Sequence, residues 1–314
     1  MEKLQTSERT ENDLILLPPS LGFLGLADDS QDSRGGDACR ALVMPFGLEA
    51  SVSYGRGTSG GPRAIIEASR EVETFDCELW TEACDHFGLW TWAGEPVPGE
   101  IGAALALLGR RVEQALTQGY FPLILGGEHS LTPGAIIPFV QRHPDLVILH
   151  FDAHADLRDG YLGEHHSHAS ALRRCLDHPG IQVVSIGIRN ISRSEAAYYE
   201  RERRRIKIFW AHEGKGPEII EQVRQLIQGR PVYLSFDLDA FDSSLMPATG
   251  TPEPGGLFWD DVMPLLRMAM RESRVLGADI VELAPVPGLH ACDFLAARLA
   301  YRILSYRFAD DRGC

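Results

Sequence analysis

The sequence predicts an α/β fold in which a mainly parallel sheet of about eight strands is covered by helices on both faces. Three observations support this class. Strand-like apolar runs alternate with helical patterns along most of the chain, and strand–helix–strand units with short links form parallel sheets. The chain has 314 residues, 44% of them hydrophobic, so it can bury a sizeable core. Neither an internal repeat nor a low-complexity linker interrupts residues 40–308.

The strands are predicted from apolar segments rich in β-branched residues, which suit a pleated and buried surface. In chain order these segments are 41–46, 121–125, 146–151, 181–188, 206–210, 232–236 and 275–282. Helices are predicted between them from apolar residues at helical spacing. They include 62–72, 100–118, 170–177, 217–227, 259–271 and 292–306. A doubly wound open sheet fits this order best, with a (β/α)₈ barrel as the structural alternative.

Residues 1–38 differ from the rest of the chain. They combine a charged start, a short segment rich in Leu, Pro and Gly, and the run ADDSQDSRGGD. This composition is typical of an arm or loop outside the core. We therefore expect an N-terminal arm or loop over 1–38 and a single domain over 39–314.

The charge balance limits the partners. The chain carries 30 basic and 44 acidic residues, a formal net charge of -14, which argues against a nucleic-acid or anionic membrane surface and favours cationic ligands. The polar start and the short, proline-interrupted apolar run 14–26 indicate neither a signal peptide nor a membrane span. Six scattered cysteines without a CxxC pair indicate reduced thiols. We expect a cytoplasmic protein.

Polar motifs follow three of the predicted strands. Residues 123–130 read LILGGEHS, residues 149–156 read LHFDAHAD, and residues 234–242 read LSFDLDAFD. In open α/β sheets the carboxyl ends of the strands form the edge where ligands bind. The three motifs should therefore meet at one site.

These motifs predict a pair of divalent metal ions. Alternate residues of an extended chain face the same side, so Asp152, His154 and Asp156 can converge, as can Asp237 and Asp239. Burying such carboxylates together is costly unless cations neutralise them. The candidate ligands are His129, Asp152, His154, Asp156, Asp237 and Asp239. This set, oxygen-rich and without thiolate, suits Mn²⁺, with Ni²⁺, Co²⁺ or Fe²⁺ as substitutes. Any one motif alone could be a hydrogen-bonded turn; three together favour the metal site.

The same blocks resemble the signature segments of the ureohydrolase family, which includes the arginases and agmatinases. The resemblance runs from SYGRGTSGGPRAI (53–65) through GGEHS, DAHADLR, SHAS, SFDLDAFD and ATGTPEPGG to DIVELAPVPGLHACDFLAA (279–297). It covers nearly the whole chain from about residue 40, and the pattern is closest to agmatinase. It implies a three-layer α-β-α fold, two Mn²⁺ per chain, and a homo-oligomer, usually a trimer or hexamer.

The resemblance also implies roles for two further residues. His168, in the SHAS block, resembles the proton-shuttling histidine of the family, and imidazole is the natural proton donor near neutral pH. The alternative is a solvated loop histidine, which we expect for His165 and His166. Glu282, at the end of a predicted strand, matches the guanidinium-binding glutamate, because a carboxylate can accept two hydrogen bonds from a planar guanidinium. Its alternative is an ion pair with a surface arginine.

The expected reaction is hydrolysis of a small cationic guanidino compound to urea and an amine, with agmatine giving putrescine as the first choice. The loop 157–164, LRDGYLGE, lacks the Asn/Thr/Ser-rich pattern of arginases, and Asp159 and Glu164 would suit a distal ammonium. Arg158 could instead bind the carboxylate of a carboxylated substrate tail. Guanidinobutyrate, guanidinopropionate, guanidine and arginine therefore stay as alternatives.

Weaker signals remain. Glu128 and Glu253 could orient ligands, and His150 is expected to be a core histidine. The segment 55–60, GRGTSG, matches the dinucleotide pattern GxGxxG, but eight residues separate it from Phe46, the end of its strand, whereas a fingerprint should follow the strand directly. A dinucleotide-binding or non-catalytic metal-binding protein is thus only a remote alternative.

Overall fold

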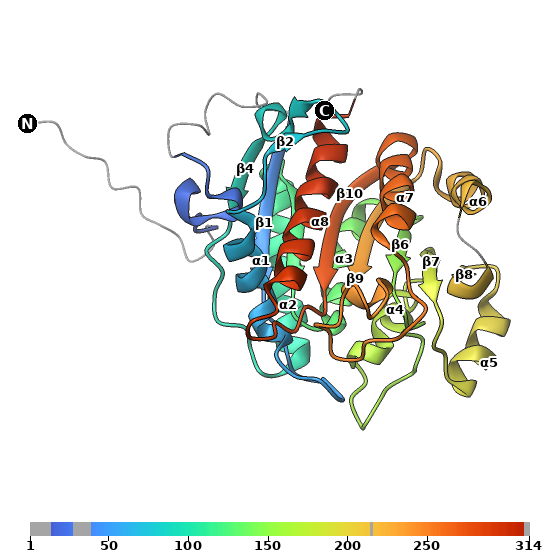
Figure 1. Ribbon diagram of the computed structural model, residues 1–314. Coiled ribbons are helices and arrows are strands. Elements are labelled where there is room, and N and C mark those ends of the chain that lie inside the picture. Colours follow the sequence, from blue (N-terminus) through green and yellow to red (C-terminus); the bar gives the residue numbers. More distant parts are fainter. Residues whose placement is uncertain (1–13, 28–38, 214–215, 311–314) are drawn as a thin grey trace, which may run out of the picture.

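The computed structural model describes residues 14–27, 39–213 and 216–310 of the chain (Figure 1). Its centre is an eight-stranded sheet with the order β4-β1-β5-β10-β9-β6-β7-β8, and every neighbouring pair is parallel. The strands are β1 (Arg40–Phe46), β4 (Gly88–Thr91), β5 (Phe121–Gly126), β6 (Val147–Phe151), β7 (Gln182–Ile188), β8 (Ile206–Trp210), β9 (Pro231–Asp237) and β10 (Arg274–Val281). The predicted parallel sheet is confirmed, and its open edges at β4 and β8 exclude the barrel.

Helices cover both faces of this sheet and complete three layers (Figure 1). One face carries α1 (Gly61–Ser69), α6 (Pro217–Ile227), α7 (Trp259–Glu272) and α8 (His290–Phe308). The other carries α2 (Ile101–Thr117), α3 (Thr132–Arg142), α4 (Ala171–Cys175) and α5 (Arg193–Glu202). Among the described residues, no helix combines the length and apolar character needed to cross a membrane.

Two hydrophobic clusters, one on each face, hold the layers together. In β1, Ala41 and Val43 belong to the cluster under α1 and α8, whereas Leu42 and Met44 belong to the cluster under α2 and α3. All four side chains are fully buried. A strand that is covered on both faces reads as a continuous apolar run. This is why most strands of the sheet could be predicted from the sequence.

Five of the strands and helices were not among those predicted. β4 has only four residues, too few for a periodic pattern to show. The helices α3 and α5 were also not anticipated. A small antiparallel pair, β2 (Phe75–Asp76) with β3 (Thr81–Glu82), lies outside the main sheet.

The described part of the N-terminal segment, residues 14–27, packs on the domain. Phe23 and Leu24 are 2% and 6% exposed and join the hydrophobic cluster under α1 and α8. The amide of Phe23 donates to Thr91 Oγ1 at 2.9 Å, and the amide of Leu24 donates to Ser69 Oγ at 2.8 Å. For these residues the expectation of a segment outside the core is wrong, because their apolar side chains fill space beside β4. Residues 1–13 and 28–38 lie outside the described part, so the division at residue 38 stays a prediction.

The cysteines largely follow expectation. Cys77, Cys84, Cys175 and Cys292 are free thiols, but Cys39 is disulfide-bonded. The expectation of reduced thiols is therefore wrong for Cys39. Spacing along the chain could not reveal this, because a disulfide depends on which cysteines meet in space.

Candidate metal centre

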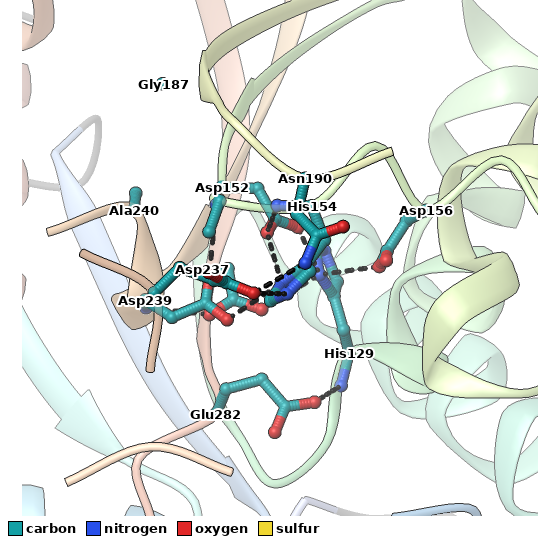
Figure 2. Close-up of polar contacts among 12 residues, drawn as sticks. His129, Asp152, His154, Asp156, Gly187, Asn190, Asp237, Asp239, Ala240 and Glu282 are labelled. Atoms are coloured by element: carbon teal, nitrogen blue, oxygen red, sulfur yellow. Dashed lines mark hydrogen bonds and ion pairs between the residues drawn. The ribbon is translucent and has the colours of Figure 1, made fainter. Parts of the chain in front are cut away.

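The candidate ligands gather at the carboxyl edge of the four central strands, β5, β10, β9 and β6. His129 follows β5, Asp152 to Asp156 follow β6, Asp237 ends β9, and Glu282 follows β10. Figure 2 shows these side chains pointing toward one another from separate strand ends. The structure thus brings all six candidate ligands together, because parallel neighbouring strands end at the same edge.

Local turns, and not extended strands, aim the carboxylates. Oδ1 of Asp152 accepts from the amide of His154 at 2.6 Å, and Oδ1 of Asp237 accepts from the amide of Asp239 at 2.9 Å. Such side-chain-to-backbone bonds two residues ahead define an Asx turn. Oδ1 of Asp239 is held in turn by the amide of Ala153 at 3.0 Å. In each of these carboxylates, one oxygen binds a backbone amide and the other faces the site. The side chains therefore converge through turns, and not through the alternation of an extended strand that the sequence analysis assumed.

His129 lies at the centre of three carboxylates. Its Nδ1 is 3.2 Å from Oδ2 of Asp152, 3.2 Å from Oδ2 of Asp156 and 3.3 Å from Oδ2 of Asp237. This nitrogen is buried and has no hydrogen-bond partner. The other nitrogen, Nε2, is 2.9 Å from the hydroxyl of Ser235, which donates to Asp279 at 2.8 Å. Because the proton of Ser235 goes to Asp279, Nε2 of His129 carries the donated proton and Nδ1 is free to act as a ligand.

A second group forms on the other side of Asp152. Nδ1 of His154 is 3.5 Å from Oδ1 of Asp152 and 3.0 Å from Oδ2 of Asp239. The ligand atoms of Asp152, His154 and Asp239 all lie within 4.8 Å of one another, as do those of His129, His150 and Asp152. Asp152 belongs to both groups. The donor set therefore suits metal binding, and Asp152 connects its two parts.

His150 is buried, as expected for a core histidine, but its position is more specific than that. Its Nε2 is 2.8 Å from Oδ2 of Asp152, and its Nδ1 is 3.0 Å from the hydroxyl of Ser185. The side chain is fully buried. It supports the Asp152 carboxylate from the interior of the sheet, which the alternation of the strand could not indicate.

Two of the site residues adopt left-handed backbone conformations. Asp156 has φ 52° and Glu282 has φ 68°, a region that residues other than glycine adopt rarely and at some cost. In Glu282 the turn directs the carboxylate toward the site, where Oε1 accepts from the amide of His129 at 2.7 Å. Strained residues of this kind concentrate at functional sites.

The electrostatics of the cluster favour added positive charge. Burial and then the neighbouring carboxylates of Asp239 and Asp152 raise the pKa of Asp237 well above its usual range. Burial lowers the pKa of His154, but Asp239 and Asp152 offset this and raise it to about 12. Within the described residues, Asp152, Asp156, Asp237 and Asp239 form ion pairs only with histidines. Protons are held where metal ions would supply the same charge.

Glu282 and His168 line the same cavity, of about 220 Å³, as the ligand cluster. Burial and the nearby Glu128 carboxylate raise the pKa of Glu282 to about 8, although the amide of His129 lowers it. A cationic guanidinium would restore its ionised form. His168 is half-buried, with Nδ1 3.2 Å from Ser51 Oγ and Nε2 3.3 Å from Ser53 Oγ. His165 instead packs on Arg174, outside this cavity.

The structure does not support the distal-ammonium role expected for Asp159 and Glu164. Neither lines the cavity of the ligand cluster. Oδ1 of Asp159 lies 2.7 Å from Nη2 of Arg174, and Oε1 of Glu164 accepts from the amide of His166 at 2.9 Å. The loop turns these carboxylates away, because they satisfy groups of the loop itself and of α4. Glu253, with 32% of its side chain exposed, does line that cavity.

No sequence pattern singled out three other residues beside the site. Asn190 follows β7 and pairs with His154 in an isolated parallel β-bridge. Its side-chain amide donates to Oε1 of Glu253 at 2.5 Å. Arg189 donates through Nη2 to the carbonyl oxygens of Asp239 and Glu253, at 2.7 Å and 2.8 Å, and so fastens two site loops to β7. Ser51 comes from the segment after β1. All three lie beyond strand ends, where only their position after an apolar run could have drawn attention.

Comparison with known proteins agrees with this geometry. The chain matches the Arginase family over residues 39–305. It is 38% identical over 280 residues to the N(1)-aminopropylagmatine ureohydrolase of Thermus thermophilus, with 86% of this chain and 91% of that protein covered. It is 32% identical over 252 residues to the agmatinase of Bacillus subtilis, covering 78% and 84%. The solved agmatine ureohydrolase of Thermoplasma volcanium superposes with a TM-score of 0.75 at 27% identity, covering 88% and 94%.

A three-layer α/β hydrolase with a His/Asp cluster at its carboxyl edge is the class that fold and site define. The chain belongs to the arginase family, the ureohydrolases whose signature segments it carries. It is accordingly a metal-dependent hydrolase that acts on guanidino carbon–nitrogen bonds.

Proposed function

We propose that the chain hydrolyses agmatine to putrescine and urea with the help of two Mn²⁺ ions. The observation that carries the proposal is the position of Asp152 between two ligand histidines, with its oxygens 3.2 Å from Nδ1 of His129 and 3.5 Å from Nδ1 of His154. In this proposal the ions are held by His129, Asp152, His154, Asp156, Asp237 and Asp239. When bound, they neutralise the carboxylates and lower the pKa of a water molecule that attacks the guanidinium carbon.

Glu282 and His168 complete the proposed reaction site. Oε1 of Glu282 is occupied by the amide of His129, and the rest of the carboxylate lines the cavity, where it accepts N–H groups of the guanidinium. His168 also lines the cavity and delivers the proton that the leaving amine needs. Binding and proton delivery are thus assigned to different residues.

Two contacts favour a substrate with a cationic tail and no carboxylate. Nε of Arg158 lies 3.7 Å from Oε2 of the buried Glu195, and its guanidinium lies 4.7 Å from the centre of the Tyr161 ring. Its charge is therefore partly compensated inside the protein and is less available to a carboxylate. Glu253, with 32% of its side chain exposed, faces the cavity and offers an acceptor to a distal ammonium.

A urea-release assay with a guanidino panel tests this proposal. The panel contains agmatine, N(1)-aminopropylagmatine, arginine, guanidinobutyrate, guanidinopropionate and guanidine, with the protein loaded with Mn²⁺. We expect the highest kcat/KM with agmatine. Faster turnover of a carboxylated substrate contradicts the assignment of the tail site, and urea release from none of the six contradicts the proposed function as a whole.

We also propose that the chain acts in the cytoplasm as a homo-oligomer, a trimer or a hexamer. The support for this is the family resemblance of the sequence. Light scattering of the purified protein tests the assembly, and a monomer contradicts it.

A further inference from the structure

A buried carboxylate behind the cavity connects to His168 through one hydroxyl group. Oε1 of Glu128 accepts from the hydroxyl of Ser51 at 2.6 Å, and Oγ of Ser51 lies 3.2 Å from Nδ1 of His168. Glu128 is fully buried. Its Oε2 accepts from the amides of Ala50 and Ser51 at 2.8 Å and 2.7 Å, and Oε1 also accepts from Ser130 at 2.5 Å. These four donors hold the carboxylate in one orientation.

This arrangement determines where the hydroxyl proton of Ser51 lies. A serine hydroxyl has one proton to donate and two lone pairs. The backbone amide of His168 donates to one lone pair at 2.9 Å, and the short contact to the Glu128 carboxylate takes the proton. The remaining lone pair faces Nδ1 of His168, so Nδ1 must be the donor in that contact.

The other ring nitrogen of His168 therefore carries the exchangeable proton. Nε2 lies 3.3 Å from the exposed hydroxyl of Ser53, and Ser53 and His168 both line the cavity. With Nδ1 kept protonated toward the interior, Nε2 can gain and lose a proton on the side where substrate binds. In the other tautomer, Nε2 would carry the proton of the neutral ring and Nδ1 would have none. Loss of the Nε2 proton would then require Nδ1 to gain a proton and change its hydrogen bond with Ser51.

We propose that Ser51 and Glu128 are positioning residues that hold His168 in its Nδ1–H tautomer and so make Nε2 the nitrogen that protonates the leaving amine. In the step, the electron pair of the broken carbon–nitrogen bond stays on the amine nitrogen, which takes the proton from Nε2. The ring returns to the neutral Nδ1–H form, and the proton is replaced from the attacking water. This inference rests on the proposed proton-delivery role of His168.

The substitution Ser51→Ala removes the link without removing the support of the loop. The amides of residues 50 and 51 still bind Oε2 of Glu128, and Ser130 still binds Oε1. We expect unchanged manganese content, thermal stability and KM, with a fall in kcat of roughly 10-fold or more, up to the 10²–10⁴-fold that general acid–base catalysis contributes. Ser51→Thr keeps the hydroxyl and should restore most of the rate.

The decisive measurement combines Ser51→Ala with His168→Ala. If Ser51 acts through the imidazole, then adding Ser51→Ala to His168→Ala changes kcat no further. Thr117→Val, which removes an exposed hydroxyl 3.3 Å from a carboxylate oxygen of Glu113 on α2, is the matched control and should keep full activity. An equal fall in kcat in both backgrounds overturns the inference while leaving the role of His168 intact. Full activity of His168→Ala itself overturns both.

Discussion

At the scale of single residues, the site depends on carboxylates that divide their oxygens between backbone and cavity. Asp152 and Asp237 each bind an amide two residues ahead and face His129 with the other oxygen. We expect Asp152→Ala and Asp237→Ala to lose bound manganese and turnover, because each leaves a ligand group open. The fold should persist in circular dichroism, since the sheet core is elsewhere. Asp145→Ala, an exposed position before β6, is the control. Turnover near normal in either site variant argues against the ligand assignment.

The substitution His168→Ala tests whether proton delivery is separate from metal binding. It contacts Ser51 and Ser53 and lines the cavity. We expect His168→Ala to retain both metal ions and its KM, and to lose about 10²–10⁴-fold in kcat. Added imidazole should restore part of the rate. Loss of a metal ion from this variant would instead place His168 among the ligands.

Glu253 tests the preference for a cationic tail. A charge-assisted hydrogen bond contributes about 1.5–3 kcal/mol, so Glu253→Gln should raise KM for agmatine roughly tenfold or more. Butylguanidine, which has no distal ammonium, serves as the matched substrate and should show no such change. If KM rises equally for both compounds, Glu253 acts on the site in general and not on the tail.

Residue types at strand ends were accessible to sequence reasoning, but their hydrogen-bond partners were not. The six candidate ligands could be named because they follow apolar runs that had to be buried strands. The contact of His150 with Asp152 and the exclusion of Asp159 from the cavity depend on side-chain directions in turns. No sequence pattern marks Ser51, because the contact that gives it a role is its hydrogen bond to Glu128, which is 77 residues away in the chain.

At the scale of elements, the buried parallel strands were the most predictable part of the chain, since covered strands read as unbroken apolar runs. Edge strand β4 and helix α3 were missed for different reasons. β4 is too short to show a period, and α3 contains Pro138, which normally breaks a helix interior. The Asx turns that follow β6 and β9 could not be told from extended strands in advance, because an Asp-x-His or Asp-x-Asp sequence fits both conformations.

A charged contact joins α7 to the end of α8. Oδ2 and Oδ1 of Asp310, with its side chain 2% exposed, lie 2.9 Å and 2.8 Å from nitrogens of Arg267 and Arg271. Burial raises the pKa of Asp310, but both arginines lower it more, to below its usual value. A depressed carboxyl pKa stabilises the fold above the unfolded value near 3.9 and loses this effect as the pH falls through the folded value.

Asp310→Asn should therefore destabilise the protein at neutral pH, by about 1–3 kcal/mol for the lost charged hydrogen bonds. The difference from the parent chain should shrink as the pH falls below about 4. Urea titrations at neutral and acidic pH measure this. A difference that stays constant across that range contradicts the role of the ionised carboxylate.

At the scale of the whole molecule, the sheet topology brings together site residues that are far apart in the sequence. The order of the sheet places β5, β10, β9 and β6 side by side. The segments that follow these strands, which are as far apart in the chain as His129 and Glu282, therefore meet at one edge (Figure 1, Figure 2). A rigid sheet then holds the carboxylates close together despite their mutual repulsion. Because ions that bind only the folded state stabilise it, we expect metal binding at the cluster to raise the stability of the whole domain.

The most direct test of the account is the amount of manganese bound per chain. Protein stripped with a strong chelator, reloaded with Mn²⁺ and freed of excess ion should contain two ions per chain by elemental analysis, and should recover urea release from agmatine in step with the second ion. Reloaded protein that holds one ion or none, or that releases urea equally well after stripping, contradicts the binuclear site formed around Asp152.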